Sequence, residues 1–175
     1  MRLDNNFKPK LTREDYGWHS RNLPHLDAED TTQFVTFRLA DSMPQELFDK
    51  WRIETPSEIQ FRKKIEAYLD SGQGECLLRR RDIAEIVEQA LLFHDEKRYK
   101  LHAWVIMPNH AHVLFTQFKA EHLSAIMHSI KSFTAQMANK TLNRKGQFWQ
   151  HESFDRYIRG WRHFNAVVRY MKIIR

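Results

Sequence analysis

Residues 101–116 read LHAWVIMPNHAHVLFT, which is an apolar run, a turn and a second apolar run. The first run is aliphatic and aromatic, as is typical of a buried strand. Pro108 and Asn109 favour a turn, and the second run is expected to return as a strand. Because alternate side chains of a strand share one face, His110 and His112 are predicted to project together just after the turn.

Two neighbouring imidazoles at the start of a strand can bind one divalent metal ion. His-x-His spacing alone is a weak indication of a metal site. The simpler alternative is a pair of hydrogen-bonded histidines at a strand end. The surrounding sequence therefore has to decide between the two interpretations.

Several separated segments carry a resemblance to one family. The histidines lie in MPNHAHVLF, which resembles the metal-binding signature of the HUH single-strand DNA transposases. Other segments resemble one bacterial branch, the REP-associated tyrosine transposases, in the same order along the chain: YGWHSRNLPH, QFVTFRLADSMP, IKSFTAQMANK, GQFWQHESFDRYIR and HFNAVVRY. The resemblance covers most of Tyr16 to Tyr170.

The resemblance implies a DNA-binding transposase that cleaves and rejoins single-stranded DNA next to hairpin-forming repeats. It implies Tyr170 as the nucleophile of a 5′-phosphotyrosine intermediate, and His110 and His112 as ligands of a divalent metal. Imidazole by itself suits zinc, manganese or iron better than magnesium. The resemblance implies Mg²⁺ or Mn²⁺, completed by phosphate oxygens, and no nucleotide cofactor.

The helical stripe that begins at Trp161 places Tyr170 at its margin, about 110° from the centre of the stripe at about 100° per residue. A tyrosine in such a position is usually an amphipathic residue at the edge of a core. The resemblance favours Tyr170 as the nucleophile, and Tyr157 is the second candidate.

One position departs from the family pattern. The family has an amide or carboxylate one turn after its tyrosine, thought to complete the metal site, and this chain has Ile174 there. Gln150, Glu152 and Asp155 are unranked candidates for the missing ligand. The alternative expectation is therefore a truncated, non-catalytic module that binds single-stranded nucleic acid. A small-molecule metal hydrolase is a weaker option.

Positive charge is concentrated in the last third of the chain. The whole chain has 28 Lys and Arg against 22 Asp and Glu, a net charge of +6. Residues 119–175 contain eleven Lys and Arg against three Asp and Glu, so they carry +8 and residues 1–118 carry −2. Such asymmetry indicates a face that binds a polyanion, although a solvated basic surface is the simpler alternative.

The residues expected to contact DNA come from both ends of the chain. In the arm of residues 1–30, aromatic and basic side chains favour base stacking and phosphate contacts, although a packed surface arm is an equal alternative on composition. The expected contacts are Trp18, His19, Arg21, Lys131, Arg156, Arg159 and Arg169.

The chain is expected to form one α+β domain. Strands are predicted at 33–39, 101–107 and 110–116 and in the second half of 147–159, and helices at 44–52, 58–69, 82–94 and 120–142 and from residue 161. This order predicts a ferredoxin-like βαββαβ antiparallel sheet, with helices mainly on one face and a helical insert at 44–96 after the first strand. Residues 97–175 would carry the metal strand, the basic helix and the nucleophile helix.

Bulk properties agree with a cytoplasmic protein. The sequence contains neither a signal-peptide pattern nor an apolar run long enough to span a membrane. The single cysteine, Cys76, cannot form an internal disulfide. Monomer and dimer both remain open.

Overall fold

The computed structural model describes residues 18–20, 24–26 and 30–174. The strands are β1 (Trp18–Ser20), β2 (Pro24–Leu26), β3 (Thr32–Arg38), β4 (Tyr99–Ile106), β5 (His110–Gln117) and β6 (Phe154–Tyr157). The helices are α1 (Gln45–Glu54), α2 (Glu58–Asp70), the 3₁₀ turn η2 (Leu77–Arg79), α3 (Arg81–His94), α4 (Leu123–Thr141) and α5 (Trp161–Ile173).

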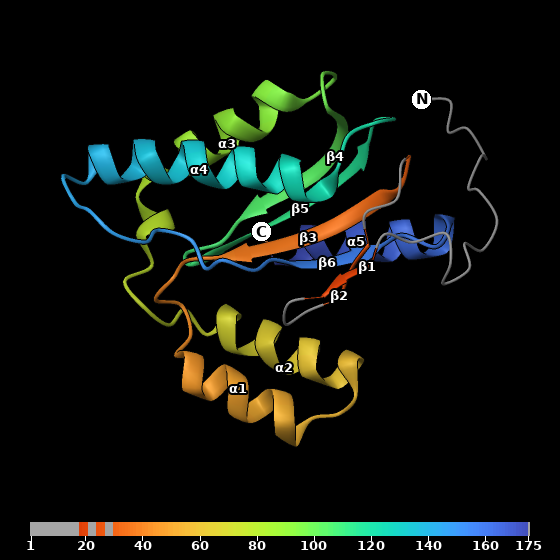
Figure 1. The fold of residues 1–175 in the computed structure, drawn as a ribbon, viewed down its shortest axis with the longest axis horizontal. Coiled ribbons are helices and arrows are strands. Elements are labelled where there is room, and N and C mark those ends of the chain that lie inside the picture. Colours follow the sequence, from red (N-terminus) through yellow and green to blue (C-terminus); the bar gives the residue numbers. More distant parts are fainter. Residues whose placement is uncertain (1–17, 21–23, 27–29, 175) are drawn as a thin grey trace.

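Within the described residues, β4, β5, β3 and β6 form one antiparallel sheet in that order (Figure 1). With α3 between β3 and β4, and α4 between β5 and β6, this is the βαββαβ arrangement. The prediction of an α+β ferredoxin-like fold is confirmed. The helical insert after the first long strand is confirmed as well, because α1 and α2 follow β3 before α3 begins.

The two helices of the βαββαβ core share one face of the sheet, above it in Figure 1. Val35 and Phe37 of β3 and Val113 of β5 point to this face, where they pack against α3 and α4. Apolar residues at helical spacing, such as Ile83 and Val87, bury the inner side of α3. This is the main hydrophobic core.

The opposite face of the sheet carries the terminal helix and the insert. Phe34 and Leu114 on this face pack against Val167 and Met171 of α5. Beside them, α1 and α2 form their own small core, which includes Phe154 of β6. The side chains that follow Phe34 at two-residue intervals on β3 therefore face the space between α2 and α5.

One element was not predicted. The arm contains a short hairpin in which β1 and β2 pair antiparallel, with Trp18 opposite Leu26. A strand of three residues is too short to show the two-residue alternation that identifies longer strands.

In the part of the chain that the structure describes, no helix combines the length and the apolar character needed to cross a membrane.

Candidate metal and tyrosine site

The turn at Pro108 and Asn109 places both histidines at the entrance of β5. Met107 donates its backbone N–H to the carbonyl of His110 at 2.8 Å, which closes the turn. His110 lies opposite Arg38 and His112 lies opposite Thr36 in the β3–β5 register. Directly opposite residues share a face, so both imidazoles lie on the face between α2 and α5.

The two imidazoles point their Nε2 atoms at each other. These atoms are 3.1 Å apart, and the rings meet nearly edge to face, with centroids 4.7 Å apart. Two ligands at right angles on an ion with bonds of about 2.1 Å lie about 3.0 Å apart. The spacing of the two nitrogens therefore fits a pair of adjacent ligands on one ion.

Hydrogen bonds fix the proton of His110 on the far side of its ring. The amide nitrogen of Asn109 donates to the backbone carbonyl of Gln73 at 2.8 Å. The amide oxygen of Asn109 therefore faces Nδ1 of His110 at 2.7 Å and must accept a proton from it. In the neutral ring this leaves a lone pair on Nε2, as metal ligation requires.

The other histidine is oriented by β3 and by stacking. Nδ1 of His112 lies 2.8 Å from the hydroxyl of Thr36. Its ring stacks on Phe34, with centroids 5.4 Å apart and planes 12° apart. Without a metal, Nε2 of His112 donates a hydrogen bond to Nε2 of His110 and the Thr36 hydroxyl donates to Nδ1 of His112. The hydroxyl can equally accept from Nδ1, and in that tautomer Nε2 of His112 has a lone pair for a metal.

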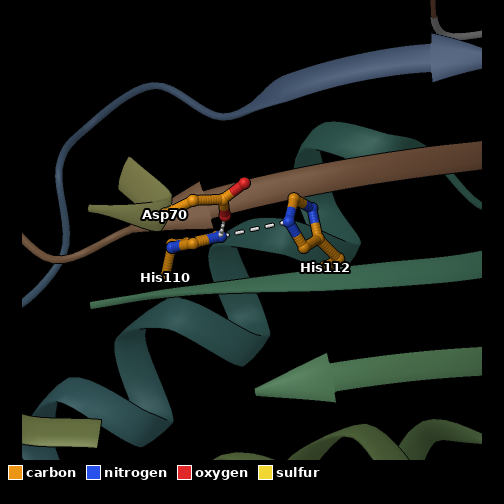
Figure 2. A group of neighbouring side chains, drawn as sticks. All are labelled: Asp70, His110 and His112. Atoms are coloured by element: carbon orange, nitrogen blue, oxygen red, sulfur yellow. Dashed lines mark hydrogen bonds and ion pairs between the residues drawn. The ribbon is translucent and has the colours of Figure 1, made fainter. Parts of the chain in front are cut away.

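A carboxylate from the insert completes the cluster. Asp70 is the last residue of α2, and its Oδ1 lies 3.6 Å from Nε2 of His110. Ligand atoms of Asp70, His110 and His112 all lie within 4.8 Å of one another, and Figure 2 shows the three side chains converging. Two imidazoles and one carboxylate fit Mn²⁺ or another divalent ion, so these residues could hold a metal.

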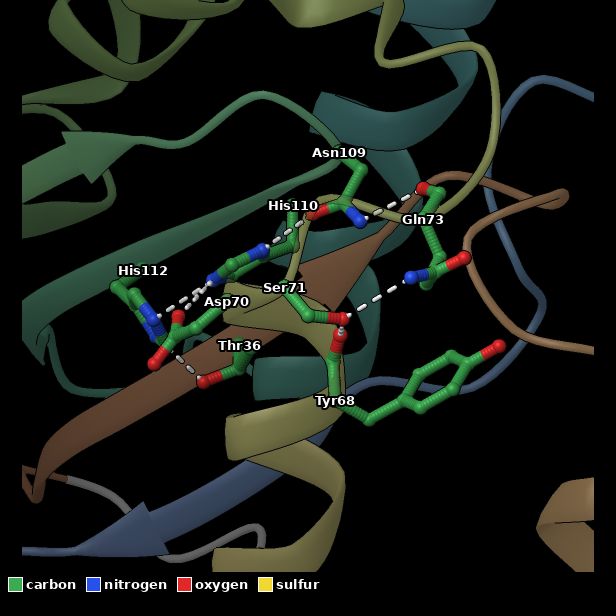
Figure 3. Close-up of polar contacts among 8 residues, drawn as sticks. All are labelled: Thr36, Tyr68, Asp70, Ser71, Gln73, Asn109, His110 and His112. Atoms are coloured by element: carbon green, nitrogen blue, oxygen red, sulfur yellow. Dashed lines mark hydrogen bonds and ion pairs between the residues drawn. The ribbon is translucent and has the colours of Figure 1, made fainter.

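The loop after α2 holds Asp70 against the histidines. Gln73 accepts from Asn109 through its backbone and donates its side chain to Ser71 at 3.3 Å, while Ser71 donates to the carbonyl of Tyr68 at 2.6 Å (Figure 3). Gly74 has φ +86°, and a Cβ there would lie 2.8 Å from the backbone oxygen of Asp41. The glycine thus allows the close turn that leads the chain back after α2.

Tyr170 of α5 reaches the same cluster. Its ring lies edge to face with His112, with centroids 5.7 Å apart, and edge to face with Phe34 at 6.3 Å. The hydroxyl is buried and has no hydrogen-bond partner among the described residues. An unpaired buried hydroxyl costs about 1–3 kcal/mol, so this oxygen is suited to a ligand that supplies a partner.

Electrostatics keeps the phenol protonated in the free protein. Burial raises the pKa of Tyr170 above its ordinary value, and the carboxylates of Glu66 and Asp70 raise it further, while Arg156 lowers it. Burial also raises the pKa of Glu66 and of Asp70. A negative phosphate near Tyr170 would therefore need positive charge beside it.

The competing tyrosine lies on the other face of the sheet. Tyr157 pairs with Gln33 in the β3–β6 register, whereas Arg156 pairs with Phe34. Since alternate residues point to opposite faces, Tyr157 is directed away from the histidines. The register therefore separates Tyr157 from the cluster of Asp70, His110 and His112, whereas Tyr170 lies beside His112.

The sequence-based candidates for a third ligand are not brought to the histidines. Asp155 pairs with Val35 and faces the α3–α4 side. Gln150 donates its side-chain amide to Gln45 at 2.9 Å. Glu152 lines a separate pocket with Arg38. Among the described residues the third group is Asp70, which the sequence did not suggest.

Ile174 lies one turn after Tyr170, as expected. Its backbone N–H bonds the Tyr170 carbonyl at 3.2 Å, and its half-buried side chain packs in the apolar cluster of Phe34 and Met171. It therefore has a packing role, and an aliphatic side chain offers no metal ligand.

Lys131 is already bound to the protein. Its ammonium donates to the backbone carbonyls of Gln150 at 2.6 Å and His151 at 2.7 Å. Burial lowers its pKa to about 8, and the neighbouring Arg38 lowers it as well. Lys131 thus anchors the loop before β6, and its predicted contact with DNA stays a prediction.

The other residues predicted to contact DNA lie on different elements of the fold. Arg156 is exposed on the histidine face, with its guanidinium 5.7 Å from the Phe34 ring centroid. Arg159 lies over the Tyr157 ring at 5.4 Å, and Arg169 is exposed on α5. Trp18 and His19 form part of β1, and Arg21 lies outside the described residues.

A family model of IS200-like transposases matches residues 77–172, which contain both histidines and Tyr170. The chain belongs to the IS200-like transposase family. No curated protein matches this transposase at a significant level. Its family membership confirms the transposase resemblance predicted from the sequence.

Solved structures that are similar to this transposase include the following two. One is a REP-associated tyrosine transposase bound to a REP hairpin, with a TM-score of 0.54 and 17% identity, covering 88% of this chain and 72% of the other. The second is a candidate transposase from Deinococcus radiodurans R1, with a TM-score of 0.38 and 11% identity, covering 89% and 96%. At this identity the first structure supports the fold.

Burial of the histidines should make the metal-free transposase sensitive to acid. Burial lowers the pKa of His110 to about 4 and that of His112 well below its ordinary value. Between the unfolded value of about 6.5 and pH 4, the unfolded chain binds a proton that folded His110 rejects. The free energy of unfolding is therefore highest above about pH 6.5. The protonation of His110 in the unfolded chain lowers it by about 3 kcal/mol as the pH falls to 4.

Urea unfolding of the metal-free protein between pH 4 and 7 measures this dependence. We expect the free energy of unfolding of His110→Gln to fall less between pH 7 and 4 than that of the wild type, because glutamine does not bind a proton in this range. Equal slopes for the two proteins would contradict the assignment.

Proposed function

We propose that this transposase cleaves and rejoins single-stranded DNA next to hairpin-forming repeats through a phosphotyrosine at Tyr170. The observation that carries the proposal is the convergence of three groups. The imidazoles of His110 and His112 face each other at 3.1 Å, Asp70 borders them, and the buried, unpaired Tyr170 hydroxyl belongs to a ring beside His112.

The proposed metal ligands are His110, His112 and Asp70. Their donor set and spacing fit a divalent ion, and the family resemblance favours Mg²⁺ or Mn²⁺. When bound, the ion supplies Lewis-acid charge for a phosphate oxygen. Burial keeps both imidazoles neutral at physiological pH, so their lone pairs are available without competition from protons.

Tyr170 performs the covalent step. Its phenol loses a proton, and the oxygen attacks the phosphorus of the scissile phosphodiester. A bond forms between the tyrosine oxygen and phosphorus, the bond from phosphorus to the 3′ oxygen breaks, and that oxygen takes up a proton to become a free 3′ hydroxyl. The 5′ side stays on the protein as a phosphotyrosine, which conserves the bond for rejoining.

The residues around Tyr170 position it for this attack. Phe34 lies against both its ring and that of His112, which holds the nucleophile and a metal ligand on one rigid surface. Arg156, over the same Phe34 ring, lowers the pKa of the phenol against the effect of burial. It also provides positive charge on the side where the phosphate would approach.

The fold and the charge support the proposed substrate class. The similar solved structure is that of a transposase bound to a REP hairpin, and the C-terminal third of this chain carries the positive charge. We infer that this chain binds a hairpin-forming single strand and cuts beside the hairpin.

Incubation with labelled single-stranded hairpin oligonucleotides and Mn²⁺ or Mg²⁺ tests the proposal. We expect a covalent DNA–protein band on a denaturing gel that retains a label placed on the 3′ side of the cut, together with a released strand ending in a 3′ hydroxyl. Chelation should remove the band. Binding without any covalent band over a wide range of metal concentrations would favour a non-catalytic module instead.

A further inference from the structure

Arg38 is a buried cation that the proposed chemistry does not use. It is the last residue of β3, and only 2% of it is exposed. Burying a charged group is unfavourable unless partners compensate for the lost water. The surroundings of its guanidinium therefore indicate what the position is suited to bind.

Few of the N–H donors of this guanidinium have an acceptor in the described part of the protein. Among the described residues its one hydrogen bond is to the hydroxyl of Ser42, at a long 3.4 Å. The guanidinium also lies 5.6 Å from the centroid of the Phe48 ring. A guanidinium has five N–H donors, so most of its hydrogen-bonding capacity lacks a partner within the described chain.

An open pocket lies beside these donors. It has a volume of about 110 Å³ and is lined by Arg38, by Gln45 and Phe48 of α1, and by residues 150–152. Burial lowers the pKa of Arg38 to about 10, so the guanidinium is still charged at neutral pH. A buried, charged and under-bonded guanidinium on an open pocket is suited to an oxyanion.

The neighbouring charges leave the pocket slightly positive. Arg38 is close enough to Lys131 to lower the pKa of its ammonium, and the Glu152 carboxylate raises the pKa of both cations. Described contacts include no ion pair within 4.0 Å between Glu152 and Arg38. Arg38 and Glu152 line the pocket, and Lys131 lies nearby with its ammonium bound to two backbone carbonyls. These three groups together carry one positive charge, which suits one phosphodiester.

The pocket is on the same face of the sheet as the candidate metal site. Arg38 lies opposite His110, and Thr36, two residues earlier on β3, bonds His112. Two residues along a strand span about 6.6 Å. The backbone positions of Thr36 and Arg38 are therefore separated by about one backbone step of a nucleic-acid strand, and His110 of the cluster lies directly opposite Arg38.

We propose that Arg38 and its pocket bind a phosphate of the DNA strand adjacent to the scissile phosphate. This inference rests on the proposed function, since it assumes that a strand crosses the histidine cluster. Arg38 would act as a positioning residue, because it fixes the register of the strand and leaves the reacting atoms to Tyr170 and the metal ligands.

Binding of phosphate-neutralised DNA tests this proposal without any cleavage. In a Tyr170→Phe background with Mn²⁺, hairpin oligonucleotides with one neutral methylphosphonate at each position in turn are compared. We expect one position beside the scissile phosphate to weaken binding about tenfold. Arg38→Gln should weaken binding of the unmodified strand by a similar factor, and the same methylphosphonate should then cost nothing further.

Controls separate this contact from a loss of folding. Arg81→Gln changes an exposed arginine on α3, across the sheet, and should leave the position dependence as it was. Arg38→Lys keeps the charge and should retain sensitivity at the same position. The variants are compared by circular dichroism and thermal unfolding, and the lysine variant carries the test if the glutamine variant does not fold.

Three outcomes would overturn the inference: a position dependence in Arg38→Gln equal to that of the parent, a lysine variant that is insensitive although folded, or inorganic phosphate that stabilises the protein through Arg38 while methylphosphonates have no effect. None of these outcomes bears on the proposed covalent adduct at Tyr170, which is tested separately in the wild-type protein. Conversely, the wild-type protein could form no adduct while binding still depends on Arg38 at one phosphate position. That result would reject the proposed catalysis and support the phosphate site.

Discussion

Tyr170→Phe is expected to abolish the covalent DNA adduct, by at least about a thousandfold in rate, while DNA binding stays close to that of the wild type. The change removes one oxygen, which is the proposed nucleophile. In the free protein this hydroxyl has no hydrogen-bond partner among the described residues, so its removal leaves no group unsatisfied and the fold should be unaffected. Single-turnover adduct formation with a labelled hairpin strand measures the loss.

Tyr157→Phe is the matched control for this prediction. It removes the same atom from a tyrosine whose place in the register directs it to the other face of the sheet. We expect this variant to form the adduct at a rate within a fewfold of the wild type. An adduct that survives Tyr170→Phe and disappears in Tyr157→Phe would reject the assignment of the nucleophile.

The central hairpin of the sheet could be predicted because its information is local. Two apolar runs around Pro108 and Asn109 set the turn, and the two-residue period of a strand places His110 and His112 on one face. The structure has both imidazoles on that face, with Nε2 atoms 3.1 Å apart. The order of strands and helices was equally readable, because each long element has its own hydrophobic period.

The assignment of Tyr170 over Tyr157 needed information from outside the local pattern. Helical spacing alone places Tyr170 at the margin of a stripe, where tyrosines commonly pack. Its proposed role depends on how α5 lies across Phe34 and His112, which is a tertiary contact. The pairing of β3 with β6, which directs Tyr157 away, joins segments more than a hundred residues apart.

Asp70 could not be found from the sequence for the same reason. It lies forty residues before His110, at the end of an amphipathic helix. In the sequence, the charged residues of this helix have the pattern of an ordinary solvated face. Its place depends on the turn through Gly74 and on the bond from Asn109 to the Gln73 carbonyl. The glycines of residues 71–74 are typical of a break after a helix, but the path of the chain after that break is set by tertiary packing.

The loss of the third ligand, the Asp70 carboxylate, should be a severe defect if the metal site is as proposed. Asp70→Ala removes an oxygen ligand next to Nε2 of His110, and a change in the groups that only orient metal ligands already costs about 10–100-fold in affinity. We therefore expect Asp70→Ala to weaken Mn²⁺ binding by more than about a hundredfold, and adduct formation to require correspondingly more metal. Electron paramagnetic resonance titration of free Mn²⁺ measures the affinity directly.

Two further variants serve as controls for the Mn²⁺ titration. His112→Ala should remove Mn²⁺ binding altogether, because it takes away one of the two facing nitrogens. Glu46→Ala, an exposed carboxylate on α1 of the same helical insert, should bind Mn²⁺ like the wild type. If Asp70→Ala behaves like Glu46→Ala while His112→Ala loses the metal, the ion is held by the histidines and the DNA phosphate, and the insert has no part in it. If Asp70→Ala behaves like His112→Ala, the helical insert supplies a metal ligand. The family resemblance places that ligand one turn after the tyrosine, and at this position Ile174 packs in the core of this chain.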